Sequence, residues 1–224
     1  WLADNLRLRP GRVVLDLAAG TGKFTRLLMS FGATVLAAEP VEGMRRGFVA
    51  AVPGVPMVAA VAEALPIAPR SLHAITVAQA FHWFDADQAF DEFARVLRPR
   101  GRVGLIWNAR DRSSEWVNEV WSIMDRVEKR APWRDHERGD DSAPRPRAGF
   151  GPLHAETFRH EQSITPEGVV ERVASVSHVA VLPPAERQRV LDEVRGVLTH
   201  HRDARGRSAL RLPYRVDAYW CERA

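Results

Sequence analysis

An apolar run that meets an acid and opens into a turn of small residues is the most informative part of the chain. Val13 to Leu17 is β-branched and apolar apart from Asp16. The following turn contains four residues with almost no side chain, Ala18, Ala19, Gly20 and Gly22. Such a turn lets a ligand lie directly against backbone N–H groups. A helix expected from Thr21 to Phe31 directs its positive N-terminal end at the same place.

Three nucleotide-binding patterns compete for this turn, and residue spacing separates them. A phosphate-binding P-loop requires Gly and Ser or Thr where the chain has Leu17 and Phe24, so that pattern fails twice. A dinucleotide fingerprint requires a third Gly near Phe24, and its absence weakens that alternative without removing it. The third pattern is an acid, a small-residue turn and a second acid after the next strand. Asp16, the turn and Glu39 match it.

The elements that must position these residues alternate in the first half of the chain. Apolar runs predict strands near 12–17, 34–39, 56–60, 72–78 and 102–108. Helical periodicity predicts helices at 21–31, 41–52 and 87–97, the last ending at Arg98-Pro99-Arg100-Gly101. Alternating strands and helices are typical of parallel strands joined by right-handed helical crossovers.

The pattern changes after Arg110. A helix is expected from Ser113 to about Lys129, with an apolar stripe formed by Trp116, Val117, Val120, Trp121 and Met124. Pro132 to Gly149 is rich in Arg, Asp, Pro and Gly and is expected to be a loop, a candidate substrate lid. The final third predicts a strand at 154–161, a helix after Thr165, a helix at 184–198 and a strand at 210–221.

Composition bounds the class of protein. The chain has 224 residues, 46% of them hydrophobic, and a net charge of only +4, with Arg interspersed among acids. The nearest basic cluster, Arg202 to Arg211, is interpreted as a solvated loop, so a nucleic-acid partner is not expected. Cys221 is the only cysteine, which excludes an intramolecular disulfide and favours a cytoplasmic setting. The longest uncharged stretch, 47–62, contains two prolines and is too short for a membrane span.

Four ordered motifs resemble the class I S-adenosylmethionine-dependent methyltransferases. The first is the acid and turn at 16–22 with Glu39. The second, Ala62-Glu63-Ala64-Leu65-Pro66, resembles the family's loop after the third strand. The third, residues 75–85, carries Ala80-Phe81-His82-Trp83-Phe84-Asp85, which is similar to a type 11 subgroup with an AxHWFD-type motif. The fourth, residues 95–101, resembles the helix exit before the fifth strand.

The resemblance implies a fold and a site. The expected fold is α/β and Rossmann-like, a seven-stranded, mostly parallel sheet with helices on both faces and an antiparallel C-terminal strand. One methyltransferase domain over 1–224 is expected, with a cofactor half at about 1–110, substrate-side elements at 111–205 and a closing strand at 210–221. Because relatives carry an upstream arm and the chain begins with Trp1, we expect the natural start to be missing.

Cofactor contacts are implied for a set of positions at the strand ends. The turn and Asp16 are expected at the methionine part of S-adenosylmethionine, and Glu39 at the ribose, because a carboxylate has paired acceptors for a vicinal diol. The full predicted cofactor set is Asp16, Ala18, Ala19, Gly20, Gly22, Glu39, Pro40, Met44, Ala62, Glu63, Ala78 and Gln79. Ala62 and Glu63 would recognise adenine through backbone N–H groups, since Val61 stands where many relatives carry Asp or Thr.

Two other departures from the family pattern lie in turns. Ala18 replaces the first Gly of the turn, which a methyl group tolerates if φ is negative there. Arg100 replaces another turn Gly, with a local effect only.

His82 is the candidate catalytic residue, because a neutral imidazole can take a proton from an acceptor. The alternative makes His82, Trp83 and Phe84 a wall between cofactor and acceptor. The aromatic residues Phe81, Trp83, Phe84 and Trp107 suggest an apolar or planar acceptor, although such residues are often core. No metal site is expected, since the histidines have no carboxylate or cysteine partner at ligand spacing.

The function expected is therefore methyl transfer from S-adenosylmethionine to a small-molecule acceptor, without a membrane partner. Two alternatives stay open: a non-catalytic module that binds S-adenosylmethionine, and a nicotinamide-dependent dehydrogenase. The missing acid near Val61 motivates the first, and the absent third Gly argues against the second.

Overall fold

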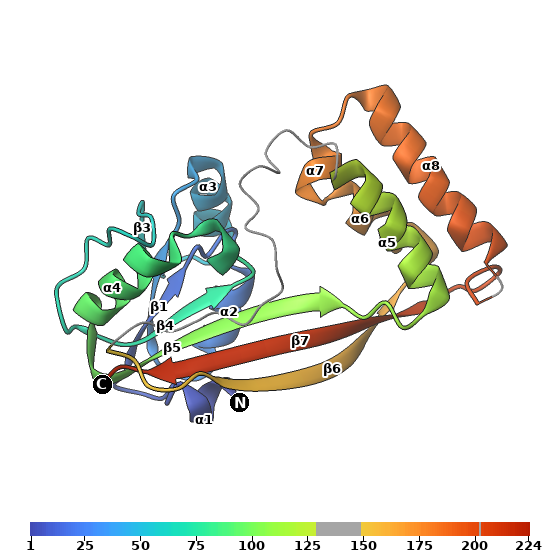
Figure 1. Ribbon diagram of the computed structural model, residues 1–224. Coiled ribbons are helices and arrows are strands. Elements are labelled where there is room, and N and C mark those ends of the chain that lie inside the picture. The colour runs from blue at the N-terminus through green and yellow to red at the C-terminus, as the bar shows by residue number, and fades with distance from the viewer. Residues whose placement is uncertain (129–148, 202) are drawn as a thin grey trace. The chain divides into compact units, whose positions relative to one another are not determined.

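Seven strands form one sheet in the order β3-β2-β1-β4-β5-β7-β6 (Figure 1). The computed structural model describes residues 1–128, 149–201 and 203–224. The expected Rossmann-like, mostly parallel sheet is confirmed. The predicted loop at 132–149 lies, except for Gly149, outside the described residues. The strands are β1 (Val13–Leu17), β2 (Thr34–Ala38), β3 (Met57–Val58), β4 (Leu72–Ala78), β5 (Leu97–Arg110), β6 (His154–Ile164) and β7 (Leu210–Glu222).

The parallel part of the sheet follows the predicted order. β1 pairs with β2 on one side and with β4 on the other, with Asp16 beside Ala37 and Thr76. β3 extends this sheet beyond β2, and β5 extends it beyond β4. Because all five strands run the same way, the residues that follow β1, β2 and β4 meet at one edge, where open α/β sheets bind ligands.

β7 closes the sheet in the opposite direction. The Arg223 N–H donates to the Gly101 carbonyl at 2.8 Å, and the Asp111 N–H donates to the Pro213 carbonyl at 3.0 Å. Partner numbers thus fall along one strand as they rise along the other, as in an antiparallel pair. The predicted strand at 154–161 is present as β6, which forms the sheet edge beside β7 and has ten of its eleven residues exposed.

The described chain divides into two compact units. The first comprises residues 1–107, 149–157 and 217–224, and the second comprises 108–128, 158–201 and 203–216. The helices of the first unit are α1 (Leu2–Asn5), α2 (Lys23–Met29), α3 (Glu42–Ala51), the short 3₁₀ helix η1 (Phe81–Trp83) and α4 (Ala86–Val96). Those of the second are α5 (Glu115–Glu128), α6 (Pro166–Ala174), α7 (Ser177–Ala180) and α8 (Pro184–His200).

Side chains alternate between the two faces of the sheet in the first unit, and each face packs against its own apolar layer. One face of the sheet packs against α4, through Leu15, Leu17, Ile75, Val77, Phe90 and Phe93. On the other face Val14 and Val35 pack with Leu28 of α2, and Ala37 packs with Phe48 of α3. Side chains that alternate along a strand point to opposite faces, so Asp16 and Thr76 lie on the α2 side.

The second unit has its own helical core. The predicted stripe of α5 is fully buried, and it packs with residues from α6, α7, α8 and the start of β7. The largest side chains of this core are Trp116, Trp121, Met124 and Tyr214. Within the described residues, no helix combines the length and the apolar character that crossing a membrane requires.

The turn between β1 and α2 is closed by a glycine that no other residue can replace without a clash. Gly22 has φ +81°, and a Cβ there would overlap Val52 Cγ2 and lie 2.9 Å from Phe48 Cδ2. Gly54 has φ +86°, with nothing within 4 Å of a Cβ, so it is a matched control for backbone strain alone.

We expect Gly54→Ala to lower the free energy of unfolding by about 1–2 kcal/mol. Gly22→Ala should lower it by about 1–3 kcal/mol more, because the methyl group overpacks the α3 contact. Urea unfolding measures both variants. Equal losses in the two variants would contradict the predicted clash.

Candidate functional site

The turn after β1 holds three residues at positive φ, Ala18 (+54°), Gly20 (+56°) and Gly22 (+81°). A negative φ, the condition under which a methyl group is tolerated at this position, is therefore not met by Ala18. Its Cβ costs about 1–2 kcal/mol in this conformation, where a glycine would cost little. Strained residues of this kind cluster at ligand-binding sites, because the surrounding structure holds them in place.

Glu39 ties the turn to the end of β2. Its side chain is 5% exposed, and its Oε2 accepts the Gly20 N–H at 2.9 Å. Its Oε1 accepts the Val41 N–H at 2.9 Å. The structure therefore brings together the turn and the second acid of the acid–turn–acid pattern. Each carboxylate oxygen has a further lone pair that can accept a ligand hydroxyl.

Asp16 lies beneath the turn rather than at its surface. It is 1% exposed, and its Oδ2 accepts the Thr25 hydroxyl of α2 at 2.5 Å. Its Oδ1 lies 3.5 Å from the Thr76 hydroxyl of β4. Burial raises the pKa of Asp16 to about 7, although the Thr25 and Thr76 hydrogen bonds act to lower it. This carboxyl therefore fastens α2 to the sheet.

The predicted adenine side contains exposed apolar residues and a buried link. Val61 is 47% and Met44 46% exposed, and Pro40 is also exposed. Ala62 is buried, and the Glu63 Oε1 accepts the N–H of Asp85 at 2.8 Å. Glu63 thereby fixes the loop after β3 to the start of α4.

The end of β4 carries the other predicted residues. Ala78 is the last residue of the strand, and Gln79 follows with φ +65° while its N–H donates to the Ile106 carbonyl at 2.9 Å. In η1, His82 and Trp83 are exposed, with ring centroids 4.9 Å apart. Gln79 is therefore a second strained non-glycine residue at this edge of the sheet.

Phe81 does not belong to an open aromatic wall. It is 8% exposed and makes edge-to-face contacts with Phe84, Phe90 and Trp107 at 5.7, 5.7 and 6.4 Å. The interpretation of this residue as part of the core is the correct one. Trp83, 59% exposed, is the aromatic residue of this segment that faces solvent.

Two supporting residues were not predicted. Arg45 Nη1 donates to the carbonyls of Glu39 at 2.9 Å and Pro40 at 2.6 Å, so it braces the segment after β2. Asp85 caps α4 by accepting the N–H groups of Asp87 and Gln88, both at 3.1 Å. An Asp just before an apolar helical pattern is an N-cap signal that could have identified Asp85.

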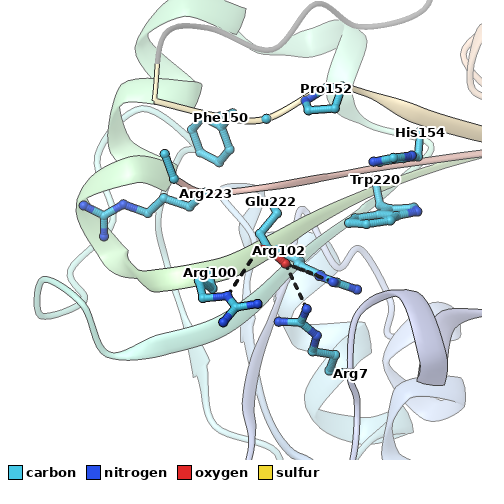
Figure 2. Close-up of a pocket in the computed structure, with 11 residues that line it drawn as sticks. Arg7, Arg100, Arg102, Phe150, Pro152, His154, Trp220, Glu222 and Arg223 are labelled. Carbon is cyan, nitrogen blue, oxygen red and sulfur yellow. Dashed lines mark hydrogen bonds and ion pairs between the residues drawn. The ribbon is translucent and has the colours of Figure 1, made fainter.

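A second polar cluster of the first unit lines a cavity of about 510 Å³ (Figure 2). Glu222 lies at its centre, with Arg102 Nη2 at 2.9 Å, Arg7 Nη2 at 3.0 Å and Arg100 Nε at 3.6 Å. None of these residues belongs to the predicted site. They are far apart in the sequence, so no local pattern predicts that they meet.

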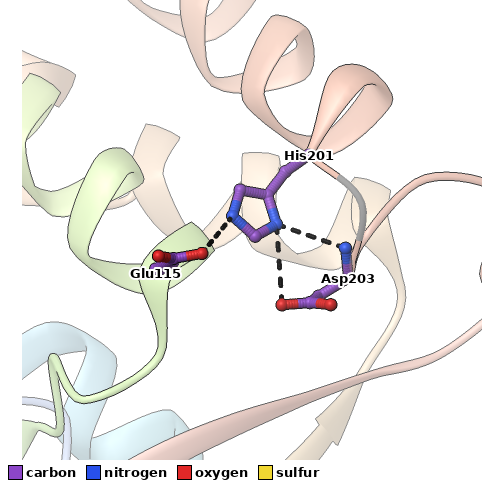
Figure 3. Close-up of side chains that lie close together, drawn as sticks. All are labelled: Glu115, His201 and Asp203. Carbon is purple, nitrogen blue, oxygen red and sulfur yellow. Dashed lines mark hydrogen bonds and ion pairs between the residues drawn. The ribbon is translucent and has the colours of Figure 1, made fainter.

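A third cluster, in the second unit, surrounds His201 (Figure 3). The expectation that the histidines lack carboxylate partners is wrong here, since His201 Nε2 lies 3.6 Å from Glu115 and its Nδ1 4.0 Å from Asp203. The Asp203 N–H also donates to Nδ1 at 3.2 Å. The two carboxylates thus face different ring nitrogens, and one ligand atom from each of the three residues lies within 4.8 Å of the others.

Comparisons with known proteins identify the family of the chain. Residues 15–105 match a family model described as a methyltransferase domain. An uncharacterised methyltransferase of Mycobacterium tuberculosis is 38% identical over 203 residues, covering 91% of this chain and 80% of that protein. An uncharacterised methyltransferase-like protein of Schizosaccharomyces pombe is 34% identical over 206 residues, covering 87% and 77%.

A solved structure of a candidate type II methyltransferase from Anaeromyxobacter dehalogenans superimposes with a TM-score of 0.69. It is 26% identical, and the match covers 97% of this chain and 92% of that one. The fold and the family together define a class I S-adenosylmethionine-dependent methyltransferase. The chain belongs to the family of the mycobacterial and yeast proteins, and its activity is methyl transfer from S-adenosylmethionine to an acceptor.

The buried carboxyl of Asp16 makes stability depend on pH. Its native pKa of about 7 lies above its ordinary value of 3.8, so between these values the folded state keeps a proton that the unfolded state has lost. Stability therefore falls as pH rises through this window, by at most about 4 kcal/mol. Asp16→Asn should abolish the fall, because its amide is neutral and still accepts the Thr25 hydroxyl.

Urea unfolding at pH 4 and pH 8 measures this effect. The variant should be the more stable protein at pH 8 and close to wild type at pH 4. The exposed Asp91→Asn serves as control and should follow the wild-type profile. A pH profile of Asp16→Asn parallel to wild type would contradict the assignment.

Proposed function

We propose that the C-terminal edge of the parallel strands binds S-adenosylmethionine and presents its methyl group to a small-molecule acceptor. The proposed cofactor residues are Asp16, Ala18, Ala19, Gly20, Gly22, Glu39, Pro40, Met44, Ala62, Glu63, Ala78 and Gln79. The observation that carries the proposal is the hydrogen bond from the Gly20 N–H to the Glu39 carboxylate. It joins the turn expected at the methionine end to the acid expected at the ribose.

The residues present fit this cofactor. Gly20 has φ +56° and nothing within 4 Å of a Cβ position, so open space lies over its backbone. Glu39 holds its two oxygens in place through backbone N–H groups on both sides, and this fixes the direction of the free lone pairs. A diol that approaches this carboxylate meets acceptors that need no reorganisation.

The chemistry of methyl transfer places few demands on the protein. When bound, the sulfonium of S-adenosylmethionine supplies an activated methyl group. The work of the chain is to hold donor and acceptor in line, and positioning of this kind contributes about 7–11 kcal/mol in well-oriented cases. The strained Ala18 and Gln79 turns, fixed by the sheet, suit that task.

His82 is the proposed general base. Its imidazole is exposed on η1, three residues after Gln79, and beside the exposed ring of Trp83. The AxHWFD-type motif that contains these residues defines the subgroup in which we place the chain. Trp83 would offer an apolar, planar surface to the acceptor.

Glu39→Gln tests the cofactor site. The amide keeps one acceptor oxygen but loses the charge, so the affinity for S-adenosylhomocysteine should fall about 10- to 100-fold. Isothermal titration measures the affinity, and thermal unfolding without ligand reports the fold. Glu42→Gln, which removes an exposed carboxylate three residues away, should leave the affinity unchanged. Wild-type affinity in Glu39→Gln would remove Glu39 from the site.

His82→Ala tests the base. If the imidazole accepts a proton, kcat should fall about 10²- to 10⁴-fold while the affinity for S-adenosylhomocysteine stays the same. A screen with labelled methyl donor over carboxylates, hydroxyls, amines and ring carbons first identifies an acceptor. His200→Ala, an exposed histidine of α8, is the control. Unaltered turnover in His82→Ala would assign His82 to the wall between cofactor and acceptor. Binding of S-adenosylhomocysteine by the wild type without turnover of any acceptor would favour a non-catalytic module.

A further inference from the structure

The arginine-lined cavity of Figure 2 includes Arg102, which lies near the beginning of β4, at the opposite end of the parallel strands from the proposed cofactor site. Arg102 pairs with Ala74 near the beginning of β4, whereas Ala78 ends that strand. Four residues of extended strand separate these positions by about 13 Å. The cavity is therefore a separate site and does not depend on the proposed function.

Positive charge is in excess around this cavity. Its lining includes four guanidinium groups, those of Arg7, Arg100, Arg102 and Arg223. Among the described residues that line it, Glu222 has the only acidic side chain. Partial burial alone would raise the pKa of Glu222, but the hydrogen bond from Arg102 and the charges of Arg7, Arg102 and Arg100 hold it below its ordinary value. One carboxylate thus forms ion pairs with three guanidinium groups.

Arg102 is held rigidly before any ligand arrives. Its side chain is 12% exposed, its Nε donates to Glu222 at 2.9 Å and its Nη1 donates to the Asn5 carbonyl at 2.6 Å. The guanidinium also lies over the Trp220 ring, 4.2 Å from its centroid. His154 stacks on Trp220 at 4.2 Å with an interplanar angle of 13°. Since both neighbours are this close, they occupy opposite faces of the indole, as Figure 2 shows.

Two other arginines reach the cavity from strained backbone. Arg7 has φ +53° and Arg100 has φ +61°. Each costs about 1–2 kcal/mol that a glycine at the same position would avoid. Strain of this kind persists at ligand-binding positions, where the side chain is needed in one place. Arg100 is also 77% exposed, so its charge is open to a ligand.

The remaining walls are suited to an organic group. Phe150 and Pro152 line the cavity beside the arginines. The volume of about 510 Å³ is within the range of small-molecule pockets, which combine apolar walls with a few convergent polar groups. The site therefore fits a molecule with an anionic head and an apolar body.

We propose that this cavity binds a phosphate monoester of a small organic molecule. Planar guanidinium groups match phosphate oxygens in a bidentate manner, and a dianionic phosphate offsets the charge that Glu222 leaves uncompensated. Arg7 and Arg100 hold the phosphate, Arg102 fixes the depth of the pocket, and the organic group lies against Phe150 and Pro152.

Isothermal titration of the full chain with phenyl phosphate and with inorganic phosphate tests the proposal. Phenyl phosphate should bind, and about 10-fold tighter than inorganic phosphate, because its ring meets the apolar walls. The double variant Arg7→Gln/Arg100→Gln should bind phenyl phosphate at least about 10-fold more weakly than wild type. Its affinity for S-adenosylhomocysteine, measured in parallel, should stay at the wild-type value.

Two further variants keep the result specific. Arg98→Gln removes an exposed charge of the same strand outside the cavity and should change nothing. Glu222→Gln removes the competing carboxylate, so its affinity for phenyl phosphate should be higher than that of wild type. Thermal unfolding confirms that this variant is folded. Absence of phenyl phosphate binding to wild type, equal binding of both phosphates, or unchanged affinity in the double variant would each overturn the proposal.

Discussion

The contact between the Gly20 N–H and the Glu39 carboxylate is the constraint on which the site depends. It joins the first turn to the end of the second strand, two segments that pair in parallel register through β1 and β2. Glycine is favoured on one side because φ of Gly20 is +56°, although a Cβ there would meet nothing within 4 Å. An acid is required on the other because it must accept from backbone and still have lone pairs free. The same turn holds Ala18, Gly20 and Gly22 at positive φ.

Asp16 supports this contact from below and illustrates the cost of a polar group in a core. Its carboxyl is removed from water and accepts the Thr25 hydroxyl, so α2 cannot shift without breaking a buried hydrogen bond. An apolar residue would pack there with less penalty, but it would leave the Thr25 hydroxyl unpaired. The buried acid therefore fixes the start of α2, and with it the turn, at the expense of stability when it ionises.

Much of the parallel half could be predicted from the sequence, because continuous apolar runs mark buried strands. β1, β2 and β4 lie within one residue of their predicted bounds. β5 begins five residues earlier than predicted, since Pro99 and Gly101 were interpreted as a helix end whereas the chain extends directly from Val96. α1, η1 and α7 have no more than four residues each and are too short to show a period. The φ of Ala18 depends on what the turn contacts, and no local pattern reveals that.

The clusters assembled from distant segments were not predictable for a related reason. Arg7, Arg100 and Glu222 come from three separate parts of the sequence and meet only because β7 returns beside β5. His201 acquires its Glu115 neighbour in the same way, from another helix of the second unit, whereas Asp203 is only two residues away in the sequence. By contrast, Asp16, the turn and Glu39 fall in one β-α-β stretch, where spacing alone brings them together.

The location of the single cysteine has a practical consequence. Cys221 is fully buried beside the α4 layer of the core, and burial raises the pKa of its thiol to about 12. A thiol that stays protonated and shielded reacts slowly with alkylating reagents. A fluorophore or spin label attached through a cysteine engineered on the surface would therefore report from that position alone, with no need to remove the native sulfur first.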